Sequence, residues 1–239
     1  ASLAMTKSFY LHLSAPNQCS YLESKRSSSQ VVVPPEDITA VDYADMLRQG
    51  FRRSGIFVYR PHCQHCQACM SLRVDVAKFV PSKRFRRILN KNKNLTCREL
   101  PLGWEEEHFQ LYMRYQAQRH KEKQDEDHTR ADYKEFVLNS NVNSRLLEYR
   151  DSNNLVVMVS LIDISDDGIS AVYTFYDTDN KNSLGHYGIL CQIKLCHALS
   201  KPWLYLGYWV EGCHKLNYKM DYQPAEVFHR DQWIPCHPD

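Results

Sequence analysis

Hydrophobic and polar residues alternate in several short segments of the chain, and this period of two predicts β-strands. Val31 to Val33 form a short apolar run that two prolines end. The turn Asp166-Asp167-Gly168 lies between two of the alternating segments and predicts a hairpin. A last apolar run, at 203–210, predicts a buried strand. The other predicted strands are 56–60, 72–79, 144–150, 154–165 and 168–177.

Apolar residues recur with helical spacing in four other segments, at 37–49, 104–122, 132–139 and 183–200. Gly50 is suited to end the first helix, and Ser183 is a candidate cap for the last one. The charge-dense stretch 119–130 predicts a solvated helix end and a loop. The buried face of the last helix is predicted to carry Ile189, Ile193, Cys196 and Leu199.

The order of these elements predicts an α+β fold. In the C-terminal part, two helices are followed by three antiparallel strands, a helix and a strand, which fits an acyltransferase domain of the GNAT type. We therefore expect a small cysteine-bearing N-terminal module at 1–82 and a GNAT-like domain at 83–239.

Composition is that of a globular protein, with 43% apolar and 24% charged residues among 239. No segment approaches the roughly 18 apolar residues that span a bilayer, so we expect no membrane segment. The N-terminus lacks a basic region followed by an apolar core, which argues against a signal peptide and favours the cytoplasm. In that setting the nine cysteines are expected to be thiols or metal ligands.

Three of these cysteines, Cys63, Cys66 and Cys69, follow a predicted strand with two residues between successive thiols. This spacing lets thiolates turn toward one cation, and Cys19 is a candidate fourth ligand. The same spacing begins iron–sulfur binding runs, although no Cys-Pro follows here. Three alternatives stay open, namely zinc, an iron–sulfur cluster and a tight loop of packed thiols without metal.

The net charge of +2 conceals a basic segment at 83–98 that contains no acidic residue. Seven cations in sixteen residues favour a polyanion partner such as a nucleic acid. A solvated basic helix, or a patch that faces the acidic residues 105–107, is the alternative. The candidate phosphate-binding residues are Lys83, Arg84, Arg86, Arg87, Lys91 and Lys93.

Arg52 and Arg53 form a second, isolated basic pair. A guanidinium suits bidentate binding of a carboxylate or a phosphate, and a surface salt bridge is the alternative.

Several of these segments together resemble one family, the aminoacyl-tRNA–protein transferases. The resemblance rests on DYADMLRQGFRRSGIFVYRP, the cysteine loop after it, VPSKRFRRILNKN and YLGYWVEGCHKLNYK, and it runs from about Cys19 to about Phe228. The eukaryotic branch has a CxxC pair at the first cysteine position, where this chain has Cys19-Ser20-Tyr21-Leu22. The short chain is similar to the bacterial branch, the aspartate/glutamate leucyltransferases.

The resemblance implies a GNAT-like fold and transfer of leucine from Leu-tRNA to the N-terminal α-amine of proteins that begin with Asp or Glu. That transfer marks the acceptor for degradation in the N-degron pathway. No cofactor is expected to be required, because the aminoacyl ester is already activated. We therefore expect positioning with modest acid–base help, and we expect a monomer.

The resemblance also suggests roles for particular residues. Arg52 and Arg53, with Lys215 in reserve, are candidates to bind the acidic side chain of the acceptor. Ser54, followed by Gly55, would let the backbone approach that side chain closely. The segment from a strand edge into a helix N-terminus is the candidate catalytic region, because free amides there suit the ester. Its polar groups are Tyr173, Tyr176, Asp177 and Tyr187.

Other functions stay open at this stage. The three candidate tyrosines could instead be half-buried core residues whose hydroxyl groups are hydrogen-bonded. Arginyl transfer by the same mechanism, a non-catalytic zinc-stabilised RNA-binding module and an iron–sulfur oxygen sensor are the alternatives.

Overall fold

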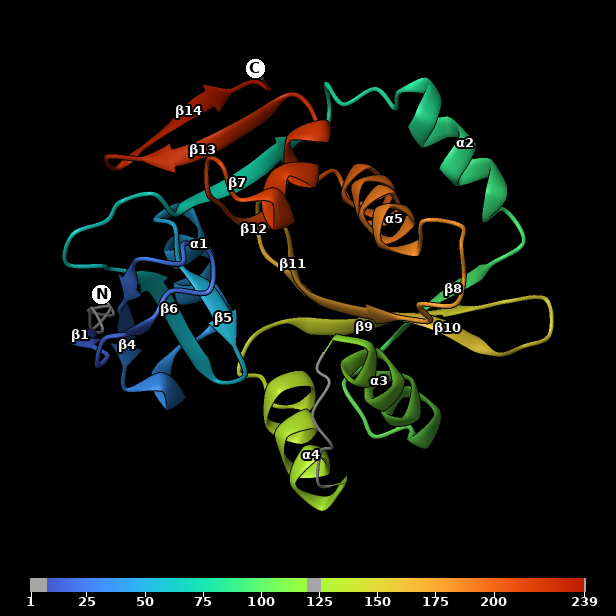
Figure 1. Cartoon of the computed structure of the whole chain (residues 1–239), viewed down its shortest axis with the longest axis horizontal. Helices are drawn as coiled ribbons and strands as arrows, with labels where there is room; N and C mark the ends of the chain where they lie inside the picture. The colour runs from blue at the N-terminus through green and yellow to red at the C-terminus, as the bar shows by residue number, and fades with distance from the viewer. Residues whose placement is uncertain (1–7, 120–125, 239) are drawn as a thin grey trace, which may run out of the picture.

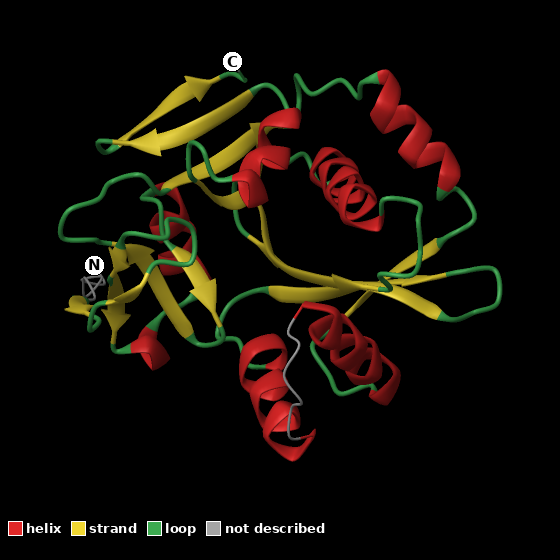
Figure 2. Cartoon of the chain, in the orientation of Figure 1, coloured by secondary structure: helices red, strands yellow, loops and turns green. Residues whose placement is uncertain are grey.

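An eight-stranded mixed sheet forms the centre of the protein (Figures 1 and 2). The computed structural model describes residues 8–119 and 126–238. The strand order in the sheet is β14-β13-β7-β12-β11-β10-β9-β8, and β11 and β12 are parallel while the other neighbours are antiparallel. The strands are β7 (Met70–Asp75), β8 (Thr96–Leu100), β9 (Ser144–Arg150), β10 (Val156–Ile164), β11 (Gly168–Tyr176), β12 (Trp203–Trp209), β13 (Ala225–His229) and β14 (Gln232–Cys236).

The N-terminal part forms a smaller, four-stranded sheet with the order β1-β4-β6-β5. Thr39 and Asp42 form a reciprocal capping box at the start of α1, and Gly50 follows its end at φ +85°, a left-handed conformation that glycine favours. The elements of this part are β1 (Tyr10–Leu13), β2 (Asn17–Gln18), β3 (Arg26–Ser27), β4 (Ser29–Val33), a 3₁₀ turn (Pro35–Asp37), α1 (Ala40–Arg48), β5 (Arg52–Ser54) and β6 (Phe57–Pro61).

Helices cover both faces of the large sheet (Figure 1). On one face, α2 and α5 pack over a core that includes Met158 and Ile162 of β10. On the other, α3 and α4 pack over Val159 and Leu161 of the same strand. Because β10 is covered on both faces, nearly all of its residues are buried. The helices are α2 (Lys83–Lys91), α3 (Glu106–Arg119), α4 (Glu126–Tyr133) with a π-helical turn (Lys134–Leu138), α5 (Leu184–Ala198) and the 3₁₀ helix η3 (His214–Asp221). None of the helices in the described ranges has the length and apolarity that a membrane crossing requires.

The two parallel strands, β11 and β12, are paired only at their beginnings, where residues 168–170 oppose 203–205. Each strand then shifts register against its other neighbour, β11 at Val172 and β12 at Leu206, as in a β-bulge. The strands part beyond these positions, so their later backbone groups need other hydrogen-bond partners.

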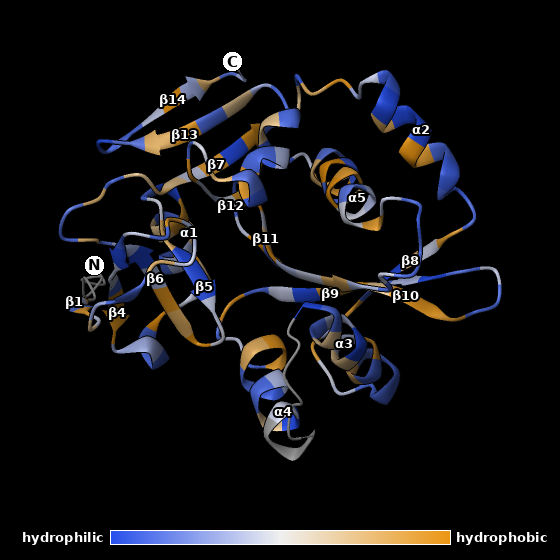
Figure 3. Ribbon diagram, viewed as in Figure 1, coloured by the Kyte–Doolittle hydropathy of each residue, from blue (hydrophilic) through white to orange (hydrophobic). Residues whose placement is uncertain are grey.

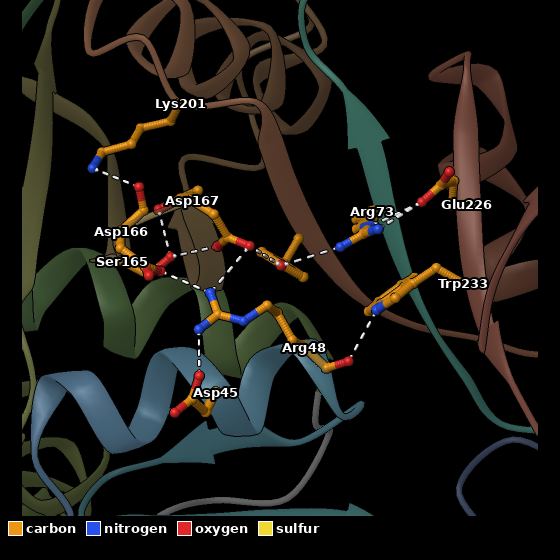
Figure 4. Close-up of polar contacts among 11 residues, drawn as sticks. Asp45, Arg48, Arg73, Ser165, Asp166, Asp167, Lys201, Glu226 and Trp233 are labelled. Carbon is orange, nitrogen blue, oxygen red and sulfur yellow. Dashed lines mark hydrogen bonds and ion pairs between the residues drawn. The ribbon is translucent and has the colours of Figure 1, made fainter. Parts of the chain in front are cut away.

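Polar contacts fix the N-terminal part to the large sheet (Figure 4). Arg48 of α1 bonds Asp45 of its own helix and Asp166 in the β10–β11 turn, at 2.8 Å for the latter. Its carbonyl accepts a hydrogen bond from Trp233 of β14. Nearby, Arg73 of β7 lies against the Trp233 ring and pairs with Glu226.

The structure confirms the predicted strands from 144 to 176, the hairpin at 166–168, the helix ended by Gly50 and the strand at 203. Several details were wrong. The strand predicted to run to residue 79 ends at Asp75, and the stretch predicted as a loop up to residue 130 is helical from Glu126, in α4. Ser183 has a left-handed backbone and makes no side-chain cap bond, and Leu199 is 43% exposed because α5 ends before it. Residues 1–7 and 120–125 lie outside the described residues, with the parts of our predictions that fall there. The predicted domain boundary at residue 82 stays a prediction. Strand β7 precedes this boundary in the sequence, yet it pairs inside the large sheet, between β13 and β12.

A buried ion pair between Arg53 and Asp163 allows a test of this arrangement. Both side chains are 1% exposed, and the guanidinium bonds both carboxylate oxygens at 2.8 Å. We expect Arg53→Met to lower the free energy of unfolding by about 3–5 kcal/mol, because it leaves a buried carboxylate unpaired. The double variant Arg53→Met/Asp163→Leu should lose less. Urea unfolding measures both, and a loss below about 1 kcal/mol for the single variant would contradict the expectation.

Candidate functional site

A cavity of about 860 Å³ opens where β11 and β12 part. Residues 171–174 and Tyr176 of β11 line one side, and residues 206–208 of β12 line the other. The rest of the wall comes from the start of α5 and the loop before it, the end of α3, the helix η3, one residue each of β5 and β6, and Tyr21. The parting of two strands thus creates a hollow in an otherwise continuous sheet.

Positive charge and aromatic rings dominate this wall. Five cations line it, and no Asp or Glu is found among the described lining residues. Seven tyrosines and His186 provide most of the aromatic surface. A cavity of this kind favours an anionic guest. The cations are Arg52, Arg119, Lys181, Lys215 and Lys219.

Arg52 reaches the cavity from β5 and is buried. Its Nη2 donates a hydrogen bond of 2.6 Å to the carbonyl of Ala171 on β11, just past the paired part of that strand. Its Nη1 is buried and has no hydrogen-bond partner within the described part of the chain. A buried N–H without a partner is costly, so this group is available to a ligand.

Lys219 reaches the same place from η3 and is also buried. Its Nζ donates a hydrogen bond of 2.7 Å to the carbonyl of Tyr208 on β12. Burial, and then the neighbouring Arg52 charge, lower the pKa of Lys219 to about 7. The ammonium therefore titrates near neutral pH.

Gly207 allows these two cations to meet. Its φ is +93°, and a Cβ there would lie 3.1 Å from Arg52 Cζ and 3.2 Å from Lys219 Nζ. A side chain at this position would thus press on both groups and also strain the backbone. The glycine at the bulge of β12 leaves the space that the two cations occupy.

His186, in the first turn of α5, connects the cavity wall with α2. Its Nδ1 lies 2.6 Å from the Tyr222 hydroxyl, and its Nε2 lies 3.1 Å from Arg84 of α2. Burial and the Arg84 charge lower the pKa of His186. The imidazole is therefore favoured in its neutral form and can accept a hydrogen bond on one nitrogen.

The basic residues predicted on 83–93 lie on one exposed surface. All six are exposed, on α2 or just after it, while Phe85 and Ile88 of the same helix are buried. Figure 3 shows this helix as mostly hydrophilic, with hydrophobic residues in between. Because Arg84 contacts His186, this surface continues to the cavity wall.

The structure brings four of the predicted site residues to the cavity, namely Arg52, Lys215, Tyr173 and Tyr176. Tyr173 accepts a hydrogen bond of 2.8 Å from Gln116, and burial raises its pKa. Lys215 is exposed at the wall.

The other four do not line the cavity. Alternation along β5 turns Arg53 away from Arg52, into the buried pair with Asp163. Ser54 pairs with Phe57 in the small sheet. Asp177 accepts the amide of Asp179 within its own loop, and Tyr187 packs edge-on against Tyr149.

The four predicted metal ligands come from two loops of the N-terminal part. Burial raises the pKa of Cys69 to about 12, with smaller contributions from the charges of Cys19, Cys63 and Cys66. The amides of residues 21 and 22 both point to Cys19 Sγ at 3.4 Å. Within the described ranges, however, no three metal-binding side chains are placed to hold one ion.

Comparisons with known proteins identify the family of the chain. The model for the N terminus of arginine-tRNA-protein transferase matches residues 17–87, and that for its C terminus matches 107–229. The chain is 45% identical to an aspartate/glutamate leucyltransferase of Polynucleobacter necessarius over 95% of this chain and 92% of that one. It is also 45% identical to the one of Thiobacillus denitrificans, over 93% and 92%. The chain belongs to the arginine-tRNA-protein transferase family. Members of this family are aminoacyltransferases that use an aminoacyl-tRNA donor, and this chain is an enzyme of that kind.

A solved structure of L-PGS from Bacillus licheniformis shares the fold of this transferase. The TM-score is 0.50 with 14% identity, over 71% of this chain and 59% of that one. At this identity the likeness concerns the fold alone.

Several wall residues of this transferase were not predicted from its sequence. Lys219 lies within the segment that carried the resemblance, four residues after Lys215, yet its burial depends on the folding of η3 against β12. Tyr115 and Arg119 come from the end of α3, and no local pattern indicates that they reach β11. The one sequence signal that could have indicated Lys219 is its position as a single lysine between Tyr218 and Met220.

The lowered pKa of Lys219 predicts a pH-dependent effect of Lys219→Met on stability. The unfolded lysine binds its proton below pH 10.5 and the folded one only below about 7, so the wild type loses stability as the pH falls through that window. The slope is at most about 1.4 kcal/mol per pH unit. Methionine does not titrate and lacks this penalty. As the pH falls from 9.5 to 7, the Tm of the variant should therefore rise relative to the Tm of the wild type. Thermal melts at several pH values check this, and a constant difference would contradict it.

Proposed function

We propose that this enzyme transfers leucine from leucyl-tRNA to the N-terminal α-amine of proteins that begin with Asp or Glu. The observation that carries the proposal is the buried pair of cations, Arg52 and Lys219, in a cavity without described carboxylates. An acceptor carboxylate would supply the missing negative charge. The names of the relatives, aspartate/glutamate leucyltransferases, support the same substrates. Acylation would mark the acceptor protein for degradation, as in the N-degron pathway.

Arg52 is the residue we assign to the acceptor side chain. Its Nη1 has no partner within the described part of the chain, and its Nη2 is held in place by the bond to Ala171, so the guanidinium is positioned to donate hydrogen bonds to a carboxylate. Lys215 lies at the exposed side of this site, and the proposal assigns no role in it to Arg53, Ser54, Asp177 and Tyr187, which do not line the cavity.

The ester is proposed to lie between the tyrosine-rich wall and the start of α5. Tyr173 and Tyr176 offer apolar ring surface for the leucyl side chain, with polar tips for orientation. Ser183, Leu184 and Gly185 line the cavity at the N-terminus of α5, which has no side-chain cap. Free amides there suit the developing oxyanion.

The tRNA is proposed to bind along the exposed basic surface of α2. Lys83, Arg84, Arg86, Arg87, Lys91 and Lys93 can contact its phosphates. The contact of Arg84 with His186 then gives the acceptor end a path from α2 to the cavity.

No cofactor is proposed for the chemistry, since the aminoacyl ester already has a good leaving group. Amides directed at a cysteine sulfur, as at Cys19, are suited to a thiolate. We propose that zinc or an iron–sulfur cluster on Cys19, Cys63, Cys66 and Cys69 would have a structural role, holding the two loops together. These residues contribute none of the lining of the cavity among the described side chains.

Three further expectations belong to this proposal. A helix that links two parallel strands which part, as α5 links β11 and β12, supports a GNAT-like class for the domain. We propose that the protein acts as a monomer, because one chain supplies every wall of the cavity. The cytoplasm is the proposed compartment, since charged tRNA is present there.

The proposal is tested by acylation of peptides that begin with Asp, Glu, Asn or Ala, with leucyl-tRNA and arginyl-tRNA compared. We expect a far higher kcat/KM for leucylation of the Asp and Glu peptides than for the slow reaction of the Asn and Ala peptides. Arg52→Gln should lower kcat/KM for the Asp peptide about 30- to 100-fold, because it removes one partner of a buried charge pair.

The matched control is Arg60→Gln, on the neighbouring strand β6 and outside the cavity wall. It should change kcat/KM less than three-fold. Transfer from arginyl-tRNA at an equal or higher rate, or equal use of Asp and Asn peptides, would refute the proposed substrates. An unchanged Arg52→Gln enzyme would remove Arg52 from the acceptor site.

A further inference from the structure

We propose that Lys219 is a catalytic residue that accepts the proton of the acceptor's α-ammonium group, and that the acceptor's own carboxylate, bound by Arg52, promotes this transfer. This inference rests on the proposed function, because it requires an acidic acceptor in the cavity. It connects the choice of acceptor with the activation of its amine.

Geometry is the first support. Lys219 Nζ and the Arg52 guanidinium both lie against Gly207 at the cavity wall, so a carboxylate on Arg52 is close to Lys219 as well. In an N-terminal Asp or Glu, the α-amine is joined to that carboxylate by a short chain. Lys219 uses one N–H on the Tyr208 carbonyl, and a neutral amine keeps its lone pair for a proton.

Electrostatics is the second support. Burial and the Arg52 charge favour the neutral amine, with a pKa of about 7. The Cys213 thiol acts in the opposite direction, and the Tyr218 ring lies 6.0 Å from Nζ. An N-terminal α-amine has a pKa of about 7.7–8.0, so passing its proton to Lys219 is unfavourable by only about ten-fold.

The acceptor carboxylate changes this balance. Bound on Arg52, it neutralises the charge that lowers the proton affinity of Lys219, and its own charge favours the ammonium form. An acidic acceptor thus makes Lys219 a better base at the moment of binding, and a neutral acceptor such as Asn does not. The preference for Asp and Glu should therefore appear in kcat as well as in KM.

The proton balance of the reaction is complete with these groups. Lys219 takes the first proton from the α-ammonium, and the freed nitrogen attacks the ester carbonyl to form the C–N bond. The second proton leaves that nitrogen for the ribose oxygen as the C–O bond breaks. Lys219 then returns its proton to water, so one proton is released per transfer.

The test is the pH profile of kcat from pH 6 to 9, measured with saturating leucyl-tRNA for Asp and Asn peptides. In the wild type, kcat for the Asp peptide should have the higher plateau and should reach it at higher pH than kcat for the Asn peptide, because the bound carboxylate raises the proton affinity of Lys219. Lys219→Gln should lower kcat for Asp about 10²–10³-fold with KM changed less than three-fold, and should abolish the difference between the two profiles.

The matched variants separate a base from a fixed charge. Lys219→Arg keeps the positive charge but cannot accept a proton, so it should be as slow as Lys219→Gln. If Lys219→Arg retains wild-type kcat and Asp selectivity, Lys219 binds the carboxylate as a cation and the proposal is overturned. Lys201→Gln, outside the cavity, is the control and should leave the rate unchanged.

Two further outcomes are decisive. Should Lys219→Gln fail to fold, the wild-type comparison alone remains decisive, since coinciding Asp and Asn profiles overturn the proposal. If the wild type does not leucylate acidic peptides at all, the proposed function fails first, and that result is distinct from a failure of Lys219.

Discussion

The interrupted pairing of β11 and β12 is the constraint on which the site depends. Two parallel strands that hydrogen-bond only over residues 168–170 and 203–205 leave backbone carbonyls without a strand partner. Arg52 donates to the carbonyl of Ala171, and Lys219 donates to that of Tyr208. The backbone is thus satisfied by two cationic side chains, which brings positive charge into the gap in the sheet.

Burying these two cations together has an electrostatic cost. A guanidinium and an ammonium side by side repel each other, and no carboxylate among the described lining residues offsets them. One consequence is the lowered pKa of Lys219. The other is an affinity for anionic groups, which suits both an acidic acceptor and the terminal phosphates of a tRNA. The same feature therefore supports stability of the parted strands and recognition of the substrates.

The sequence predicted much of the fold because its patterns are local. The periods of two and 3.6, the turn at 166–168 and Gly50 each depend on a few neighbouring residues. The site was predicted less completely, because it depends on contacts between distant segments. Arg52 and Arg53 look alike in the sequence, and only strand alternation and the position of Asp163 separate them. Lys219 became visible as a site residue only when η3 was seen against β12.

The most direct test of this account is a crystal structure of the enzyme with a short peptide that begins with Asp. We expect the side-chain carboxylate within about 3 Å of the Arg52 guanidinium, with the α-amine next to Lys219 in the cavity between β11 and β12. A peptide whose carboxylate binds away from Arg52, or whose α-amine lies far from Lys219, would contradict the central claim.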